Sequence, residues 1–404
     1  MRILLLKPLT TMTLALLLTA CGGETGIDEG GKAANVRGVT ETEIIIGSQN
    51  DLSGPASIIG VAMINGARMK FDEVNDSGGI HGRKVRFVVE DAQYQVPRAI
   101  QAANKLINRD GIFFMMLSMG TPMNNAIMPM LFEKNIPNLF PATAARSMSE
   151  PFRRLQFTGL GTYYQQIRAS VRYFVESGEA STPCVVYQDT DFGQEILEGA
   201  QDQVAEMGLE LAAVSAHRPT DTEFTSAILR LRSAGCDLVL MGTIHKDTIL
   251  VLEAARKMGW DEVRWAGTTA SYINAVASMD SGASEGFSVF QHMAPIHRDD
   301  ADIEPAIADW WDRYEERFGM EPDWGALEGY RSAEFVSWAM DLAGSNLTVD
   351  SLITAMESAG DYTDFFGVTS SYGPGDHSGA NSAVLSVVKN GRWVGQSATV
   401  TYED

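Results

Sequence analysis

Residues 43–91 contain the stretch that decides the fold, EIIIGSQNDLSGPASIIGVAMINGARMKFDEVNDSGGIHGRKVRFVVED. The β-branched run at 43–47 is typical of a strand buried on both faces. Four apolar residues then follow at the spacing of one helical stripe, which we expect to face a sheet: Met63, Ala67, Phe71 and Val74. Gly78 and Gly79 end the helix, because its C-terminal cap often needs a positive φ, and a period of two resumes at 85–89. The stretch therefore predicts one βαβ unit with parallel strands.

Alternating strands and helices continue along the chain and group into two series. The first series has strands at 112–117, 137–141 and 155–158, with helices at 97–109 and 124–132. The second has strands at 184–187, 209–216, 236–241 and 263–267, with helices at 162–176, 196–207, 223–233 and 247–258. Each series alternates as a doubly wound parallel sheet does, so we expect an α/β protein with two lobes of similar design.

The remaining residues are expected to return to the first lobe and then to the second. After a strand at 286–291, helices at 303–318, 324–342 and 349–357 complete the first lobe. The segment at 366–372 crosses back, and a hairpin with an Asn390-Gly391 turn follows. The predicted first lobe is 39–157 plus about 290–364, and the second is 158–289 plus about 365–404, so the chain crosses between lobes three times.

The first twenty residues are a predicted signal peptide, in which Arg2 and Lys7 accompany an apolar run. The run ends in Leu18, Thr19, Ala20 and Cys21, which resembles the bacterial lipobox. That resemblance implies cleavage before Cys21 and lipidation of its thiol; the alternative is an ordinary signal peptide cleaved at a small residue. Residues 21–38 are then the lipidated cysteine and a flexible, glycine-rich tether. We expect an extracytoplasmic, periplasmic protein anchored to a membrane only through Cys21.

The composition excludes some partners. The net charge is −21, and it becomes −23 once the two positive charges of the signal peptide are removed. Such acidity argues against binding to nucleic acid or to an anionic lipid surface.

Two cysteines follow Cys21, and disulfides persist in exported proteins. Cys184 and Cys236 both begin apolar runs that we interpret as neighbouring parallel strands entered from the same end. A disulfide between them is therefore feasible. In the chain-entropy model, closing the loop between them would stabilise the folded protein by about 4 kcal/mol. The alternative is a pair of buried free thiols.

The sequence carries no motif of a common enzyme class: it has no Gly-x-Ser-x-Gly, no His-Glu-x-x-His, no phosphate loop and no dinucleotide fingerprint. Its six histidines lack metal-ligand spacing. The loop at 189–193 is better interpreted as a helix cap than as a calcium loop, because Ala200 stands where a bidentate glutamate is needed. We expect no catalytic residues, no metal and no cofactor.

Polar loops that contain small residues recur where the predicted parallel strands end. In open α/β sheets ligands bind at this edge, and the N–H groups of the helices that follow suit a carboxylate. From these loops we take the following candidate ligand-binding residues: Leu52, Ser53, Gly54, Ser118, Met119, Gly120, Thr121, Ala142, Thr143, His245, Lys246, Asp247, Thr268 and Thr269. Two such lobes facing each other form a binding cleft.

One set of residues resembles a known family signature: Gly66, Ala67, Asn75, Gly78, Gly79, Ile80, Gly82 and Asp91. It is similar to the Gly-Ala…Asn-x-x-Gly-Gly-Ile-x-Gly…Asp signature of the periplasmic binding proteins for branched-chain amino acids, the receptors of ABC importers. The likeness covers nearly all of residues 40–395. It implies the type I periplasmic-binding fold, with two hinged lobes that close on a small ligand.

The resemblance also implies roles for single residues. The loops at 117–121 and 142–143 resemble those that hold the ligand carboxylate. Tyr163 or Tyr164, Tyr187 and Phe192 match positions where aromatic residues wall the side-chain pocket; the alternative for them is core packing.

The loop after Met241 departs from the family pattern. Family members that bind amino acids place an acidic residue there to receive the α-ammonium group, and this chain has Lys246 followed by Asp247. Asp247 serves if the loop is shifted by one residue. Otherwise Lys246 stands in that place, where it repels an ammonium group and attracts a carboxylate, or it points to solvent.

These observations predict a monomeric solute receptor that binds an amino acid-like, carboxylate or amide metabolite and delivers it to ABC permease subunits. One alternative is a receptor of the same fold that presents its ligand to a signalling partner. Another is an exported hydrolase with an unrecognised site.

Overall fold

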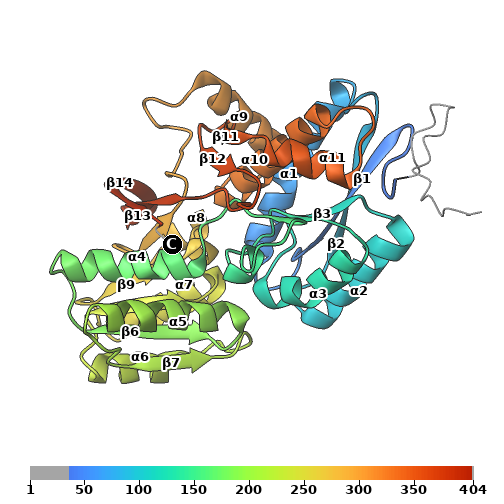
Figure 1. The fold of residues 1–404 in the computed structure, drawn as a ribbon. Helices are drawn as coiled ribbons and strands as arrows, with labels where there is room; N and C mark the ends of the chain where they lie inside the picture. Colours follow the sequence, from blue (N-terminus) through green and yellow to red (C-terminus); the bar gives the residue numbers. More distant parts are fainter. Residues whose placement is uncertain (1–35, 403–404) are drawn as a thin grey trace, which may run out of the picture. The chain divides into compact units, whose positions relative to one another are not determined.

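The computed structural model describes residues 36–402. The predicted signal peptide, the lipidation site Cys21 and most of the predicted tether lie outside the described residues. The strands form two main sheets and one two-stranded sheet (Figure 1). Between residues 36 and 402, no helix has both the length and the apolar character needed to cross a membrane.

The first sheet has five parallel strands in the order β2-β1-β3-β4-β5. Its strands are β1 (Glu43–Asn50), β2 (Lys84–Asp91), β3 (Phe114–Met116), β4 (Asn138–Leu139) and β5 (Gln156–Phe157). β1 pairs with β2 on one side and β3 on the other, and α1 (Ser57–Asp76) connects β1 to β2. The predicted βαβ unit is therefore present.

Helices cover both faces of this sheet. Ile45 and Met115 pack in a cluster with residues of α2 (Val96–Lys105), the π-helical turn Leu106–Asp110 and α3 (Thr121–Glu133). Ile44 and Ile46 belong to the cluster on the opposite face, which includes residues of α1. This alternation is the period of two expected for a strand buried on both sides.

The second sheet has seven strands in the order β14-β13-β10-β9-β8-β6-β7. Five are parallel: β6 (Pro183–Gln188), β7 (Val214–His217), β8 (Leu238–Gly242), β9 (Arg264–Gly267) and β10 (Ser288–Gln291). β13 (Ser382–Lys389) and β14 (Arg392–Thr401) add an antiparallel edge. The helices are α4 (Tyr163–Glu176), α5 (Asp191–Glu206), α6 (Thr225–Ser233), α7 (His245–Lys257) and the short α8 (Asn274–Ala277). A disulfide joins Cys184 on β6 to Cys236 just before β8, and these strands are neighbours.

The chain between the second sheet and its final hairpin packs beside the first sheet. It forms α9 (Pro305–Phe318), α10 (Trp324–Leu342), α11 (Val349–Glu357), β11 (Gly360–Thr363) and β12 (Thr369–Tyr372). α10 packs along α1 because glycines let the backbones approach: a Cβ on Gly329 would lie 1.8 Å from the Met63 carbonyl oxygen, and one on Gly66 would lie 2.0 Å from that of Ala326. We call the first sheet with α1–α3, α9–α11 and β11–β12 the first lobe, and the second sheet with α4–α8 the second lobe.

The third crossing between the lobes lies later than the sequence predicts. β12 pairs with β11, and the Tyr372 ring at its end contacts Phe140 and Phe335 of the first lobe. The chain therefore turns toward the second sheet after Tyr372 and not near residue 365. The first crossing is the segment 158–162 between β5 and α4, and the second is the segment 292–304 between β10 and α9. After Tyr372 the chain runs beside the first crossing, where the Thr158 N–H donates to the His377 carbonyl oxygen.

Candidate ligand-binding site

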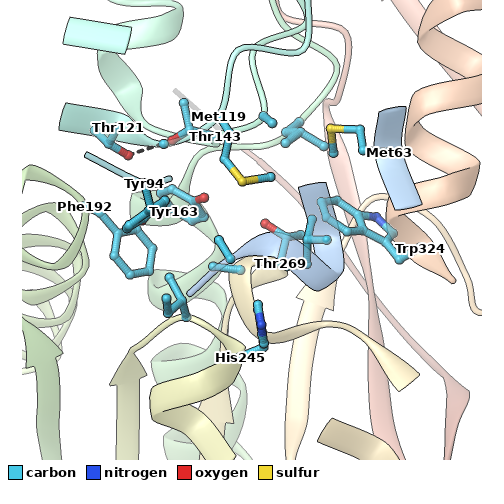
Figure 2. A pocket seen from close by; sticks show the side chains of 17 residues that line it. Met63, Tyr94, Met119, Thr121, Thr143, Tyr163, Phe192, His245, Thr269 and Trp324 are labelled. Atoms are coloured by element: carbon cyan, nitrogen blue, oxygen red, sulfur yellow. Dashed lines mark hydrogen bonds between the residues drawn. The ribbon is translucent and has the colours of Figure 1, made fainter. Parts of the chain in front are cut away.

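Both lobes contribute residues to a cavity whose empty volume, including the open solvent at its mouth, is about 490 Å³. Its lining residues from the first lobe and the first crossing are Ala56, Ile59, Met63, Tyr94, Met119, Gly120, Thr121, Ala142, Thr143, Leu160 and Trp324. Those from the second lobe are Tyr163, Phe192, Ile244, His245, Thr269 and Ala270. We call this space the main cavity; Figure 2 shows its side chains.

The first-lobe edge of the main cavity has an unusual backbone. Tyr94 follows β2, Leu117 follows β3 and Phe140 follows β4, and their φ angles are 54°, 54° and 49°. Residues other than glycine seldom adopt such φ angles. Each strained residue costs on the order of 1–3 kcal/mol and persists only where the surrounding structure holds its backbone in place. Three successive strands thus end in strained residues at the sheet edge where ligands bind in α/β folds.

The polar end of the main cavity is a pair of hydroxyl groups. The Thr121 and Thr143 side-chain oxygens lie 2.6 Å apart, and both residues are buried (Figure 2). Their mutual hydrogen bond uses one of two hydroxyl protons, so the pair keeps one proton to donate. Thr121 also begins α3, so its N–H has no acceptor within the helix, and the positive end of the helix dipole lies here. This end suits a carboxylate or an amide oxygen.

The walls of the main cavity are apolar. Tyr163 and Phe192 meet edge to face with ring centroids 4.9 Å apart, and burial raises the pKa of the Tyr163 hydroxyl to about 12, so the ring stays neutral. In Figure 2, Met63 and Trp324 lie on the side of the main cavity away from the threonine pair. The ligand that fits has a polar group at one end and an apolar body.

The second lobe supplies two neutral polar residues. Burial lowers the pKa of His245 to about 4, and its imidazole is 3% exposed, so it is uncharged at neutral pH. Its Nδ1 has no hydrogen-bond partner within residues 36–402 and is free to bind a ligand group. Thr269 is held by Gln166, whose side-chain oxygen accepts from the Thr269 N–H at 2.9 Å and whose amide donates to the Thr269 hydroxyl at 3.3 Å.

Neither Lys246 nor Asp247 lines the main cavity. Lys246 is half-buried, whereas Asp247 is 0% exposed. The Gln188 amide donates to Asp247 Oδ2 at 3.1 Å, and burial raises the pKa of the Asp247 carboxyl to about 7. No Asp, Glu, Lys or Arg side chain in the described part of the chain lines this cavity.

Some of the other predicted residues stabilise the loops around the main cavity. In the first loop, the Leu52 N–H and the Ser53 hydroxyl donate to Asp91, and the Gly54 N–H donates to Asp51. The Ser118 carbonyl oxygen accepts from the Asn124 side-chain amide at 2.7 Å. These bonds fix the loops, and none of these four predicted residues lines the main cavity.

The remaining predicted residues do not line the main cavity either. The Tyr164 hydroxyl donates to Asp202, and Tyr187 packs next to Gly242. Thr268 caps the short helical turn that follows it, accepting from the Ala270 N–H.

Several lining residues were absent from the sequence prediction: Ala56, Ile59, Met63, Tyr94, Leu160, Ile244, Ala270 and Trp324. Ile59 and Met63 lie on α1 and Trp324 begins α10, and apolar residues on helices resemble core residues in the sequence. The sequence pattern places Met63 on the stripe that faces the sheet. Phe71 on that stripe does contact Phe87 of β2, but Met63 reaches the main cavity.

Comparison with known proteins agrees with this architecture. A family model described as "Periplasmic binding protein" matches residues 43–392. Leu/Ile/Val-binding protein homolog 1 of Brucella abortus is 23% identical over 304 residues, covering 75% of this chain and 80% of that protein.

Two solved structures share the fold. A fatty acid ABC transporter substrate-binding protein from Thermomonospora curvata has a TM-score of 0.82 and 22% identity, over 92% of this chain and 95% of the other. A solute-binding protein from R. palustris in complex with benzoate has a TM-score of 0.77 and 18% identity, over 87% and 95%. The predicted fold class, the type I periplasmic-binding fold, is thereby confirmed, and the chain belongs to the periplasmic binding protein family.

Proposed function

We propose that this protein is the extracytoplasmic solute receptor of an ABC importer and that its ligand is an apolar carboxylic acid, or the corresponding amide, without a protonated amine. The observation that carries the proposal is the lining of the main cavity. Apolar walls lead to a hydroxyl pair at a helix N-terminus, and no charged side chain from residues 36–402 lines the cavity.

A carboxylate finds partners in such a cavity, and an ammonium group does not. The hydroxyl pair, the helix N-terminus and the neutral His245 can all donate hydrogen bonds. An α-ammonium group needs a carboxylate nearby, because a buried unpaired charge is costly. Asp247, the acidic candidate from the sequence, does not line the main cavity; its carboxyl accepts a hydrogen bond from Gln188, and with a pKa of about 7 it is only partly ionised at neutral pH.

The names of the relatives are compatible with this ligand class. They include proteins for leucine, isoleucine and valine, for a fatty acid and for benzoate. All of these ligands carry a carboxylate, and only the amino acids carry an amine. The ligand classes therefore differ in whether they carry an amine. The uncharged lining of the main cavity favours the carboxylic acids that lack one.

Two cross-lobe contacts support ligand capture by closure of the lobes. The Asn125 amide on α3 donates to Asp191 at the start of α5, and Glu195 on α5 accepts from the Arg146 N–H between β4 and β5. A ligand that touches both lobes favours the state in which they meet. Anchoring through Cys21 would keep the receptor beside its permease.

Identifying the ligand that stays bound to the protein during purification tests this proposal. The protein is purified without added solutes and denatured, and the released small molecules are identified by mass spectrometry. We expect a carboxylic acid or an amide that lacks an amine. Release of an α-amino acid in stoichiometric amount would contradict the proposed ligand class.

A further inference from the structure

A second cavity lies behind one wall of the main cavity. Its empty volume, including the open solvent at its mouth, is about 350 Å³. Its lining residues come from both lobes and from the second crossing: Tyr272, Asn274, Met293, Ala294, Pro295, Ile296, His297, Pro322, Asp323, Trp324, Leu327 and Trp393. Of these, Trp324 alone also lines the main cavity, so its indole is the partition between the two spaces.

Trp324 is held at a fixed position. It is the first residue of α10, and Asp323 caps this helix by accepting from the Gly325 N–H at 3.0 Å and the Ala326 N–H at 3.4 Å. The close packing of α10 on α1 fixes the helix start relative to Met63, which faces the main cavity beside the indole (Figure 2). Trp324 is 8% exposed, and its Nε1 has no hydrogen-bond partner among the described residues. Its position therefore depends on packing and on the helix start.

The second cavity suits an apolar chain. The Trp393 indole donates to the Ile273 carbonyl oxygen at 3.0 Å and the Tyr272 hydroxyl donates to Ser386 at 3.3 Å, so their polar atoms are already paired. Their rings pack in a tilted arrangement, with a centroid distance of 4.4 Å and an interplanar angle of 41°. Met293, Ile296 and Leu327 add apolar surface. The lining also has three polar side chains, of which His297 bonds to the Trp393 carbonyl oxygen and Asp323 caps α10, while Asn274 is the third.

We propose that Trp324 is the specificity-determining residue that sets the length of the ligand. The threonine pair holds the carboxyl end, the apolar tail extends toward the indole, and the indole closes the space beyond it. The natural ligand is then a short or aromatic acid. A smaller side chain at this position joins the cavities and admits long-chain acids. This inference rests on the proposed function for the identity of the polar end.

The test is a chain-length series measured by isothermal titration calorimetry on the full mature protein. Straight-chain acids from butanoate to dodecanoate and the matching primary alkanols are titrated into wild type and Trp324→Ala. Each buried methylene strengthens binding about fourfold. We expect the wild-type affinity to rise with chain length, then stop rising and fall, and the Trp324→Ala affinity to keep rising by this factor for several further carbons.

Two control variants separate loss of the partition from a general loosening. Trp324→Phe keeps a ring at the boundary and should keep the wild-type length limit. Leu327→Ala enlarges only the second cavity, since Leu327 does not line the main one, and it should keep the limit as well. Trp324→Leu replaces Trp324→Ala should the latter unfold below the assay temperature.

The outcomes separate this inference from the proposed function. If wild type and Trp324→Ala show the same chain-length limit for both acids and alkanols, Trp324 does not set the length of the ligand. Failure of every acid to bind wild type would overturn the proposed ligand class. The alkanols, which carry no carboxylate, would then test whether Trp324 separates the two cavities. A longer chain-length limit for alkanols in Trp324→Ala than in wild type would support this role, and an equal limit would overturn it.

Discussion

The hydroxyl groups of Thr121 and Thr143 form the polar end of the main cavity. Replacing both with valine keeps the shape and removes the remaining donor. Because a hydrogen bond to a charged group contributes about 1.5–3 kcal/mol, the double variant should bind its carboxylate ligand about 10- to 100-fold more weakly. Titration calorimetry measures this change.

The matched control for the threonine pair lies on the two-stranded sheet. Thr363 and Thr369 form a similar hydroxyl pair at 2.9 Å that is exposed to solvent. Their double valine variant should bind ligand as wild type does. Equal affinity of both double variants would exclude Thr121 and Thr143 from the site.

Asp247 should make the stability of the protein depend on pH. Burial raises the pKa of its carboxyl to about 7, from an ordinary value near 4. The native state thus keeps a proton that the unfolded state loses, so this contribution to stability is full below about pH 4 and is lost as the pH rises to about 7. Asp247→Asn should therefore be more stable than wild type at pH 8, by up to about 4 kcal/mol, with the advantage vanishing near pH 4.

Urea unfolding of wild type and Asp247→Asn at several pH values measures this difference. The exposed Asp350, which pairs with Arg154 at 2.8 Å, provides the control, and Asp350→Asn should show no such pH dependence. A constant difference between wild type and Asp247→Asn from pH 4 to pH 8 would contradict a buried, protonated Asp247.

At the scale of elements, the closely packed helices α1 and α10 form one wall of the main cavity. A Cβ on Gly329 would lie 1.8 Å from the Met63 carbonyl oxygen, so Gly329→Ala must push the helices apart. We expect a loss of roughly 1–3 kcal/mol in the free energy of unfolding, from strain in a packed core. We also expect weaker ligand binding, because Met63 and Trp324 shift with their helices.

Chemical denaturation and ligand titration check the Gly329 prediction. Gly373 has open space around its Cα and no positive φ, so Gly373→Ala is a control that should change neither quantity by much. Wild-type stability and affinity in Gly329→Ala would mean that the helices can separate freely, against the packing argued above.

Elements were easier to predict from the sequence than the residues of the site. Strand periodicity and the double-glycine stop identified β1, α1 and β2, and α10 and α11 begin and end where the apolar pattern predicts. β11 was missed because GDYT has no apolar alternation, and β12 was assigned to the second lobe because sequence does not reveal strand pairing.

The residues of the site divide in the same way. Thr121, Thr143 and His245 follow strand ends, which sequence can locate, and they line the main cavity. Trp324 and Met63 come from helices, and their position depends on how α1 packs against α10. The direction of Asp247 depends on the contact between the first turn of α7 and Gln188 at the end of β6, which no local pattern encodes.

At the scale of the whole molecule, Glu195 joins the lobes without lining the main cavity. Its two side-chain oxygens lie 3.0 and 2.9 Å from the Arg146 nitrogen, and it also accepts from the Tyr164 N–H at 3.3 Å. Glu195→Ala leaves these partly buried donors without their partner where the lobes meet, at a cost of about 1 kcal/mol or more. Ligand affinity should fall by about 5- to 100-fold, although no ligand contact is removed.

Glu198 supplies the control for Glu195. It is exposed and pairs with the Arg146 guanidinium, and an exposed ion pair contributes little, so Glu198→Ala should bind nearly as wild type does. Small-angle scattering should show less ligand-induced compaction in Glu195→Ala than in wild type. Full affinity and full compaction in Glu195→Ala would remove this contact from the closing mechanism.

The central claim is that the main cavity accepts a carboxylate and rejects an α-ammonium group. The most direct measurement compares ligands that share a carbon skeleton: 4-methylpentanoate with leucine, and 3-phenylpropanoate with phenylalanine, by titration calorimetry at neutral pH. An unpaired buried charge costs the amino acid more than 1.4 kcal/mol, so the acid of at least one pair should bind more than about tenfold tighter than its partner. Tighter binding of the amino acid in either pair would contradict the account.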